Sequence, residues 1–117
     1  MPLQSIDLSR NSLKFIPPQI FSYITLISLD VSRNRLQGFP PDIKLLVNLE
    51  KLIAISNHLR LRQLPVNELA SLHNLKLIDL RYNRKLKQAA LDSLNEVILP
   101  NNSLLEIRCT ISSQEEN

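Results

Sequence analysis

The sequence is short of glycine, cysteine and aromatic residues, and each shortage excludes a class of protein. Its 117 residues include one glycine, one cysteine and no tryptophan, and only 4% are aromatic. A single glycine cannot build the glycine-rich loops that hold phosphate groups. A single cysteine, Cys109, cannot form an internal disulfide. With so few aromatic rings, any hydrophobic core must be built from aliphatic side chains.

Targeting and membrane-spanning segments are also missing. The chain begins Met1-Pro2-Leu3-Gln4-Ser5, without the basic start and apolar run of a signal peptide. No stretch approaches the roughly 18 apolar residues that a membrane-spanning helix needs. Small secreted domains usually carry several disulfides, which this chain cannot form. We therefore expect a cytoplasmic protein that does not bind membranes.

What the sequence does contain is an internal repeat. Four copies follow the pattern L-x-x-L-x-L-x-x-N-x-L from residues 3, 26, 49 and 75, and a partial copy starts at residue 104. In each copy, two apolar residues two positions apart point to one face of a strand. One repeat cannot bury this face alone, so successive repeats stack around a shared core. The copies read Leu3-Ile6-Leu8-Asn11-Leu13, Leu26-Leu29-Val31-Asn34-Leu36, Leu49-Leu52-Ala54-Asn57-Leu59, Leu75-Ile78-Leu80-Asn83-Leu86 and Leu104-Ile107-Cys109.

This pattern resembles the leucine-rich repeat family, from residue 3 to about residue 110. The segments Ile16-Pro17-Pro18-Gln19-Ile20 and Phe39-Pro40-Pro41-Asp42-Ile43 look like the L-P-x-x-I element of the intracellular class typified by Ras-suppressor and scribble-like proteins. The third repeat departs from this class by three extra residues, and the fourth lacks the element. The resemblance implies an α/β leucine-rich repeat solenoid, with a curved parallel β-sheet on the concave face and turns and short helices on the convex face. We expect the domain to span 1–111, followed by a polar tail or linker at 112–117.

The ends of the array are expected to differ from its middle. After the fourth asparagine, apolar residues at 90, 91, 94, 97 and 98 have helical spacing and predict a helix over 87–97, followed by a strand at 104–110. Such an atypical last repeat is usual in solenoids. Nothing covers the apolar edge of the first repeat, which starts at Leu3. Either an upstream segment covers this edge, or the chain stacks or dimerises through it.

The asparagines of the repeat are expected to be structural, and the sequence offers no catalytic cluster. The amides of Asn11, Asn34, Asn57 and Asn83 can satisfy buried backbone groups where each strand ends. The two histidines, at 58 and 73, fall in turns without neighbouring metal ligands. Cys109 takes an inward slot, where we expect a buried apolar residue and not a nucleophile. The sequence therefore predicts no enzyme, no metal and no cofactor.

The residues that alternate with the inward apolar ladder form the candidate binding surface. In repeat three, Leu49 and Asn57 fix the register, so Ala54 points inward while Ile53 and Ile55 point outward. Two outward isoleucines with charged neighbours are typical of an apolar binding spot with a polar rim. The alternative is that loops or the rest of a longer protein cover them. The predicted partner-binding residues are Ile53, Ile55, Arg81, Tyr82, Asp30, Arg33 and Asp79.

A second candidate surface is a basic edge in the turns that follow the asparagines of repeats three and four. Arg35 lies on the same edge one repeat away. The edge is either a solvated rim or a site for an acidic or phosphorylated protein segment. Nucleic acid is not expected, because the net charge is only +3 and Tyr82 is the only aromatic residue near this edge. The basic edge consists of Arg60, Arg62, Arg84, Lys85 and Lys87.

These features predict a non-catalytic module that binds a protein partner on its concave face. By resemblance, the partners of such repeats include small GTPases, phosphatases and scaffold proteins. The alternative is a regulatory or substrate-recognition segment of a larger signalling enzyme, such as a kinase, phosphatase or ubiquitin ligase. Sequence beyond either end of the chain would distinguish the two.

Overall fold

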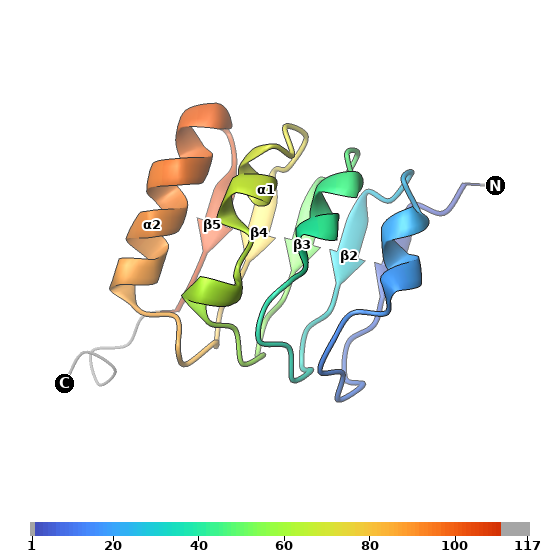
Figure 1. Cartoon of the computed structure of the whole chain (residues 1–117), viewed down its shortest axis with the longest axis horizontal. Coiled ribbons are helices and arrows are strands. Elements are labelled where there is room, and N and C mark those ends of the chain that lie inside the picture. The colour runs from blue at the N-terminus through green and yellow to red at the C-terminus, as the bar shows by residue number, and fades with distance from the viewer. Residues whose placement is uncertain (1, 111–117) are drawn as a thin grey trace.

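A computed structural model describes residues 2–110, which form a parallel sheet of five strands. The strands lie side by side in chain order, as Figure 1 shows. Their central residues are aligned without offset, so Leu29 lies opposite both Ile6 and Leu52. The predicted leucine-rich repeat solenoid is confirmed. The strands are β1 (Ser5–Asp7), β2 (Ser28–Asp30), β3 (Lys51–Ile53), β4 (Leu77–Asp79) and β5 (Glu106–Arg108).

Short helices cover the convex side of the sheet (Figure 1). In repeats one and two a 3-10 helix starts at the second proline of a Pro-Pro pair, where the fixed φ of proline suits the first turn. Repeats three and four use α-helices, and the longer one packs beside the shorter. The helical elements are η1 (Pro18–Ser22), η2 (Pro41–Leu45), η3 (Leu61–Gln63), α1 (Val66–Ala70), α2 (Gln88–Ile98) and η4 (Leu99–Asn101).

The core between these two layers is a stack of aliphatic side chains, one set from each repeat. Leu36, Leu59 and Leu86 occupy one slot of the stack and are 0% exposed. Ala54 points inward and is also 0% exposed, which confirms the predicted register of repeat three. Complete burial of one such leucine contributes about 1.5–3 kcal/mol. Most of the stability of the fold therefore comes from this apolar stack.

A ladder of asparagine side chains joins the repeats where the strands end. The Oδ1 of Asn83 accepts hydrogen bonds of 3.1 Å from the backbone N–H groups of Asn57 and Leu59, in the preceding repeat. Its Nδ2 donates to the carbonyl oxygens of Ala54 and Leu80, at 3.0 and 2.9 Å. Asn34 makes equivalent bonds two repeats earlier along the sheet. The predicted structural role of the asparagines is confirmed.

A second polar ladder, which the sequence analysis did not anticipate, joins the opposite ends of the strands. The Nδ2 of Asn48 donates to the carbonyl of Ile24 at 2.8 Å, and the Nδ2 of Asn74 donates to the carbonyl of Val47 at 2.9 Å. In repeat two, the hydroxyl of Thr25 makes the corresponding bond to Leu3. Both edges of the solenoid are therefore held by side chains that bond to the backbone of the preceding repeat.

The residue before each ladder asparagine has a left-handed backbone conformation. Its φ is 63° at Arg10, 57° at Arg33 and Ser56, and 62° at Tyr82. This conformation is costly for L-residues with a Cβ atom, and it is most unusual for a bulky one such as tyrosine. Hydrogen bonds from the next residue, the ladder asparagine, hold the turn in place in each repeat.

In the last repeat, the buried leucine that precedes the strand lies one residue closer to the strand than the repeat pattern predicted. Leu105 is 6% exposed and fills the ladder slot, whereas the predicted Leu104 is 90% exposed. The N–H of Leu105 donates to the carbonyl of Asn102, as the N–H of Leu75 donates to that of Leu72. Cys109 packs against the core but is half-buried, not buried as predicted. The predicted tail at 112–117 lies outside the described residues.

The two ends of the sheet differ in how they are covered. The helix predicted at 87–97 is observed as α2, and it closes the array with Leu94 and Ile98 against the core, at 1% and 0% exposure. At the other end, Leu3 is 41% exposed and Ile6 and Leu8 are half-buried. One side of β1 has no neighbouring strand among the described residues.

Candidate functional site

The concave face of the sheet, which points away from the helices, presents one side chain per strand in a row. The residue after the central, inward-pointing residue of each strand is aligned with its neighbours in the sheet. Three of these residues are aspartates and one is an arginine, and only β3 presents an apolar side chain. The row reads Asp7, Asp30, Ile53, Asp79 and Arg108.

Each aspartate of the row accepts a hydrogen bond from the backbone N–H two residues further on. The bond from Ser9 to Asp7 is 2.9 Å long, and so is the bond from Ser32 to Asp30. The hydroxyl and the N–H of Ser9 both bond to Asp7 and lower its pKa from the ordinary value of 3.8. The carboxylates therefore stabilise the ends of their own strands. This role was not anticipated from the sequence, which placed Asp30 and Asp79 among the partner-binding residues.

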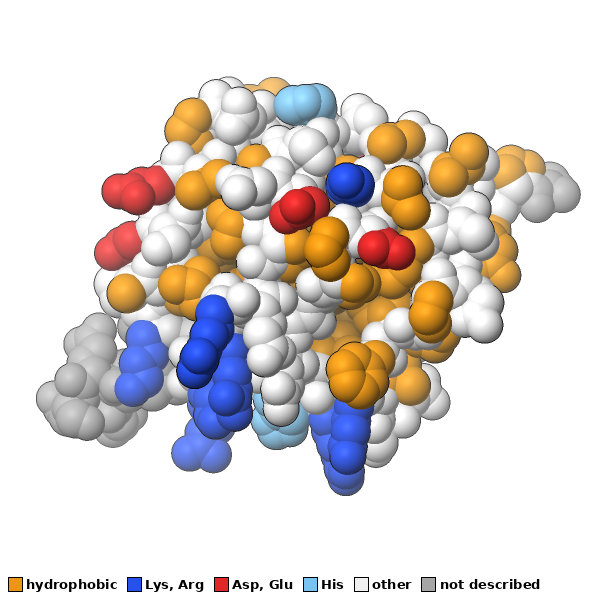
Figure 2. All heavy atoms as spheres, viewed as in Figure 1, with side chains coloured by type: hydrophobic (Ala, Val, Ile, Leu, Met, Phe, Trp, Pro, Cys, Tyr) orange, Lys and Arg blue, Asp and Glu red, His pale blue; other side chains and the backbone are white. Residues whose placement is uncertain are grey.

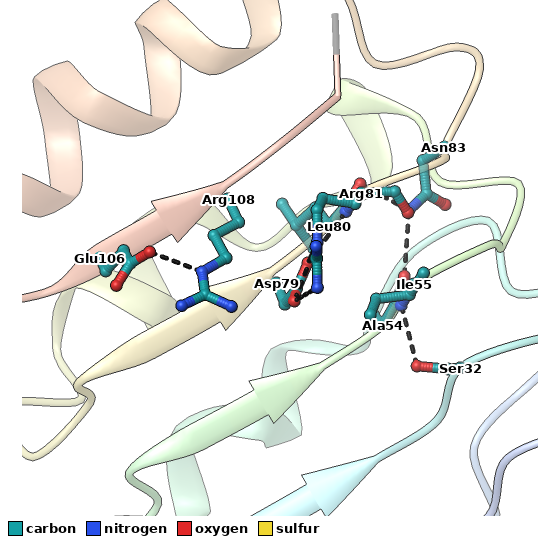
Figure 3. Close-up of polar contacts among 9 residues, drawn as sticks. All are labelled: Ser32, Ala54, Ile55, Asp79, Leu80, Arg81, Asn83, Glu106 and Arg108. Carbon is teal, nitrogen blue, oxygen red and sulfur yellow. Dashed lines mark hydrogen bonds and ion pairs between the residues drawn. The ribbon is translucent and has the colours of Figure 1, made fainter.

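Repeat three has no aspartate in this slot, and a neighbouring repeat supplies the missing acceptor. The N–H of Ile55 donates to the hydroxyl of Ser32, at 3.0 Å, as Figure 3 shows. Ser32 is 8% exposed, so its hydroxyl is held against the backbone that it serves. Ile53 can therefore replace an aspartate without leaving the N–H of Ile55 unsatisfied.

Ile53 is the last residue of the middle strand of five and Ile55 follows two residues later; both are half-buried. They belong to the outward slots, since Leu52 and Ala54 on either side of Ile53 are 0% exposed. Predicted neighbours of this pair are also accessible: Arg33 is exposed, and Tyr82 is 60% exposed. We call Ile53 and Ile55 the apolar centre.

Two arginines of the concave face are held by carboxylates two residues before them (Figure 3). The Nε of Arg81 lies 2.9 Å from one oxygen of Asp79, and its Nη2 lies 2.8 Å from the other. Arg81 covers Asp79, which is 2% exposed, so a partner on this face would contact the guanidinium of Arg81 and not the carboxylate of Asp79. The hydrogen bonds to Asp79 raise the pKa of Arg81, and those to Glu106 raise the pKa of Arg108. A bidentate pair of this kind fixes the guanidinium in one orientation.

The basic edge lies along one margin of the molecule. Figure 2 shows Lys and Arg side chains gathered along the lower margin, where the chain turns after the strands. Arg60 is half-buried and the other members of the edge are exposed. Within residues 2–110, no carboxylate lies within 4.0 Å of any of these five cationic groups. The Nε of Arg60 is buried and has no hydrogen-bond partner in this described part of the chain.

A hydrophobic groove that the sequence analysis missed opens beside the basic edge, between the loops of repeats one, two and three. Its volume is about 800 Å³, and its walls include Phe15, Phe21 and Phe39, which are all the phenylalanines of the chain. The only sequence signal was that these three residues lie within 25 positions of each other. Their convergence depends on loops that the apolar repeat pattern does not describe. We call this site the phenylalanine groove.

The single glycine, Gly38, shapes one wall of the phenylalanine groove. A Cβ atom at this position would lie 2.0 Å from the carbonyl oxygen of Gln63, which is far inside contact distance. The absence of a side chain lets the loop of repeat two lie directly against repeat three. The N–H of Phe39 then donates to the same carbonyl at 3.1 Å. Glycine is required here for space, not for a left-handed backbone.

The remaining candidate residues form no reactive cluster. Among residues 2–110, no group of three or more His, Cys, Asp and Glu side chains is placed to hold a metal ion. Both His58 and His73 are exposed. In the same described part of the chain, no helix is long and apolar enough to cross a membrane.

The stacked parallel strands, the shared aliphatic core and the asparagine ladder define a repeat solenoid. Residues 2–59 match the leucine-rich repeat family. A solved leucine-rich repeat protein of Leptospira interrogans has the same fold, with a TM-score of 0.77 and 28% sequence identity. The match covers 90% of this chain but 25% of that one, so the chain spans about a quarter of its length. No curated protein sequence matches the chain significantly. The chain belongs to the leucine-rich repeat family; its place in the intracellular class remains a prediction.

Proposed function

We propose that this leucine-rich repeat chain is a module that binds a protein partner on its concave face, around Ile53 and Ile55. Leucine-rich repeats are generally protein–protein interaction modules. The observation that carries the proposal is the position of the apolar centre. It lies on the middle strand, in a row where the flanking strands present Asp30 and Asp79.

The hydrogen bond from Ile55 to Ser32 supports a binding role for the apolar centre. It supplies the acceptor that an aspartate provides in the flanking repeats, so the fold tolerates the isoleucine without depending on it. An apolar pair at the middle of an open face, with charged groups around it, has the composition of an interface hot spot. Arg33, Arg81 and Tyr82 form the polar rim in this arrangement.

The proposal is tested by capturing partners from native cells with the whole chain and with the double variant Ile53→Asp/Ile55→Ser. We expect the variant to fold normally, because changes at outward positions usually alter the free energy of unfolding by less than about 0.5 kcal/mol. Binding to the captured partner should weaken by about 2 kcal/mol or more, the scale of a central hot spot. Thermal unfolding and a binding titration measure the two effects separately.

The chain offers a matched control on another surface. Leu45 and Val47 have the same spacing as the isoleucine pair and are 48% and 54% exposed. The double variant Leu45→Asp/Val47→Ser should leave binding unchanged. If the isoleucine variant is folded and binds its partner as tightly as the original chain, the site is not on the concave face. If it unfolds, the two isoleucines belong to the core.

A further inference from the structure

The phenylalanine groove has features of a binding site that the concave face does not share. Its floor is apolar, since Ile16, Phe21 and Phe39 are 5%, 4% and 6% exposed. Phe15 stands at its border with 83% of its surface exposed. A phenylalanine so exposed has no role in the core, and its contact with water is unfavourable. A groove of about 800 Å³ lies within the range of pockets that bury a ligand or a few side chains.

The charges around the groove point to an acidic occupant. Lys14 and Arg35 line it, together with His58, and Asp42 is the only carboxylate in its lining. In the described residues, no carboxylate lies within 4.0 Å of Lys14 or Arg35, so neither cation is neutralised by an ion pair. The basic edge continues this positive margin toward repeat four (Figure 2). A negatively charged segment would therefore be attracted along the whole margin.

We propose that the phenylalanine groove binds an acidic peptide segment of a partner protein. One or two apolar side chains of the segment insert beside Phe15 and Phe39, while its carboxylates face Lys14 and Arg35. This site is separate from the apolar centre, because the loops that line it include neither Ile53 nor Ile55. A partner that uses both sites would gain affinity from the two contacts together. The apolar floor favours a peptide over a nucleic acid, whose phosphates would contact only the margin.

The test is selection from a random peptide display library against the whole chain, followed by titration of the enriched peptides. We expect the enriched sequences to combine Asp or Glu with Leu, Ile or Phe. Phe15→Ser should weaken their binding by about tenfold or more, and Lys14→Glu/Arg35→Glu should weaken it further and reduce its dependence on salt. Because all three residues are exposed, these variants should keep the fold.

Two controls separate this site from other surfaces. Leu104→Ser removes an apolar side chain that is 90% exposed at the far end of the array and should leave peptide binding unchanged. Ile53→Asp/Ile55→Ser should also leave it unchanged, so failure of one proposal is not failure of the other. The proposal is wrong if selection enriches no acidic peptide, or if Phe15→Ser binds the peptides equally well. Tighter binding of a single-stranded oligonucleotide than of any enriched peptide would also overturn it.

Discussion

Single residues in this fold act mainly by supplying acceptors to backbone N–H groups at the strand ends. Asp7, Asp30 and Asp79 each serve the N–H group two residues further on in their own repeat. Ser32 does the same for repeat three from outside that repeat. The aspartates of the row on the concave face therefore have a structural role. Ile53 has no such role, because Ser32 accepts the hydrogen bond from the N–H of Ile55.

Ser32→Ala tests this account. The substitution removes the acceptor of the Ile55 N–H and should lower the free energy of unfolding by about 1 kcal/mol. Adding Ile53→Asp should restore most of the lost stability. The new carboxylate would accept a hydrogen bond from the N–H of Ile55, as Asp30 accepts one from the N–H of Ser32 in repeat two. Urea unfolding of the two single variants and the double variant measures the coupling.

Ser9→Ala is the control for this cycle. Ser9 takes the same slot in repeat one, but the corresponding N–H in repeat two, that of Ser32, already donates to Asp30. The substitution removes only the hydroxyl bond to Asp7, which still accepts the N–H of residue 9. Its effect should be smaller than that of Ser32→Ala. If Ser32→Ala lowers the free energy of unfolding equally in the presence and absence of Ile53→Asp, the new carboxylate does not replace the Ser32 hydroxyl as acceptor.

The asparagine ladder leads to a second residue-scale prediction. Asn83 is 1% exposed and accepts hydrogen bonds from two N–H groups of the preceding repeat. Asn83→Ala leaves both without a partner, and we expect the free energy of unfolding to fall by about 2–6 kcal/mol, from about 1–3 kcal/mol for each buried group. Asn11→Ala is the matched control, because Asn11 is exposed and its side chain donates only to carbonyls of its own repeat. Similar losses in chemical unfolding for the two variants would show that the ladder is not the source of this stability.

At the scale of whole elements, the repeat pattern predicted the strands of the regular repeats correctly. The prediction was wrong in the last repeat, whose length differs. The strands and their register followed from the alternation of apolar residues, because only one register buries Leu52 and Ala54 together. The last repeat was displaced by one residue, since Leu104 and Leu105 are both leucines and sequence spacing cannot choose between them. Packing chooses, because only Leu105 reaches the core.

The candidate sites divide in the same way. The outward direction of Ile53 and Ile55 followed from strand periodicity, and so did the position of the basic edge after the strands. The burial of Asp79 beneath Arg81 did not, because it depends on the conformation of a long side chain. The phenylalanine groove was missed for a related reason. Its walls come from loops whose conformation depends on close packing at Gly38 and not on a periodic pattern.

The closing helix α2 gives the prediction that belongs to this scale. Leu94 is 1% exposed in the core, and Leu94→Ala should lower the free energy of unfolding by about 2–5 kcal/mol through lost contacts and a residual cavity. Leu91→Ala, on the same helix but half-buried, should cost less. Hydrogen exchange should show the extra opening first in β4 and β5, because each repeat is supported by its neighbours. Uniform acceleration in all five strands would instead indicate a single cooperative unit.

At the scale of the whole molecule, the array is a slab of 49 × 33 × 18 Å with unequal ends. Among residues 2–110, both outer strands, β1 and β5, have no neighbouring strand on one side, but α2 packs over the last repeat while Leu3 is exposed in the first. Strand edges of this kind pair readily with other chains. We therefore expect the chain to self-associate through its first repeat at micromolar concentrations.

Sedimentation velocity over a range of concentrations tests this expectation. Leu3→Glu should shift the chain toward monomer, because it places a charge on the edge that would be buried. Leu104→Glu, which alters an exposed leucine near the opposite end, should not. A monomer whose first-strand amides exchange slowly would contradict the expectation, since an uncovered edge should exchange fast.

The left-handed turns before the ladder asparagines have a consequence for the handedness of the building blocks themselves. At Arg10, Arg33, Ser56 and Tyr82 the backbone adopts the φ that a mirror-image amino acid prefers. In a chemically synthesised chain, D-alanine in place of Ser56 would relieve a steric cost of about 1–2 kcal/mol. The same replacement at Leu52, in the middle of a strand, would disrupt the sheet. The solenoid thus contains one position in each of its first four repeats at which a D-residue would stabilise a fold otherwise built from L-residues.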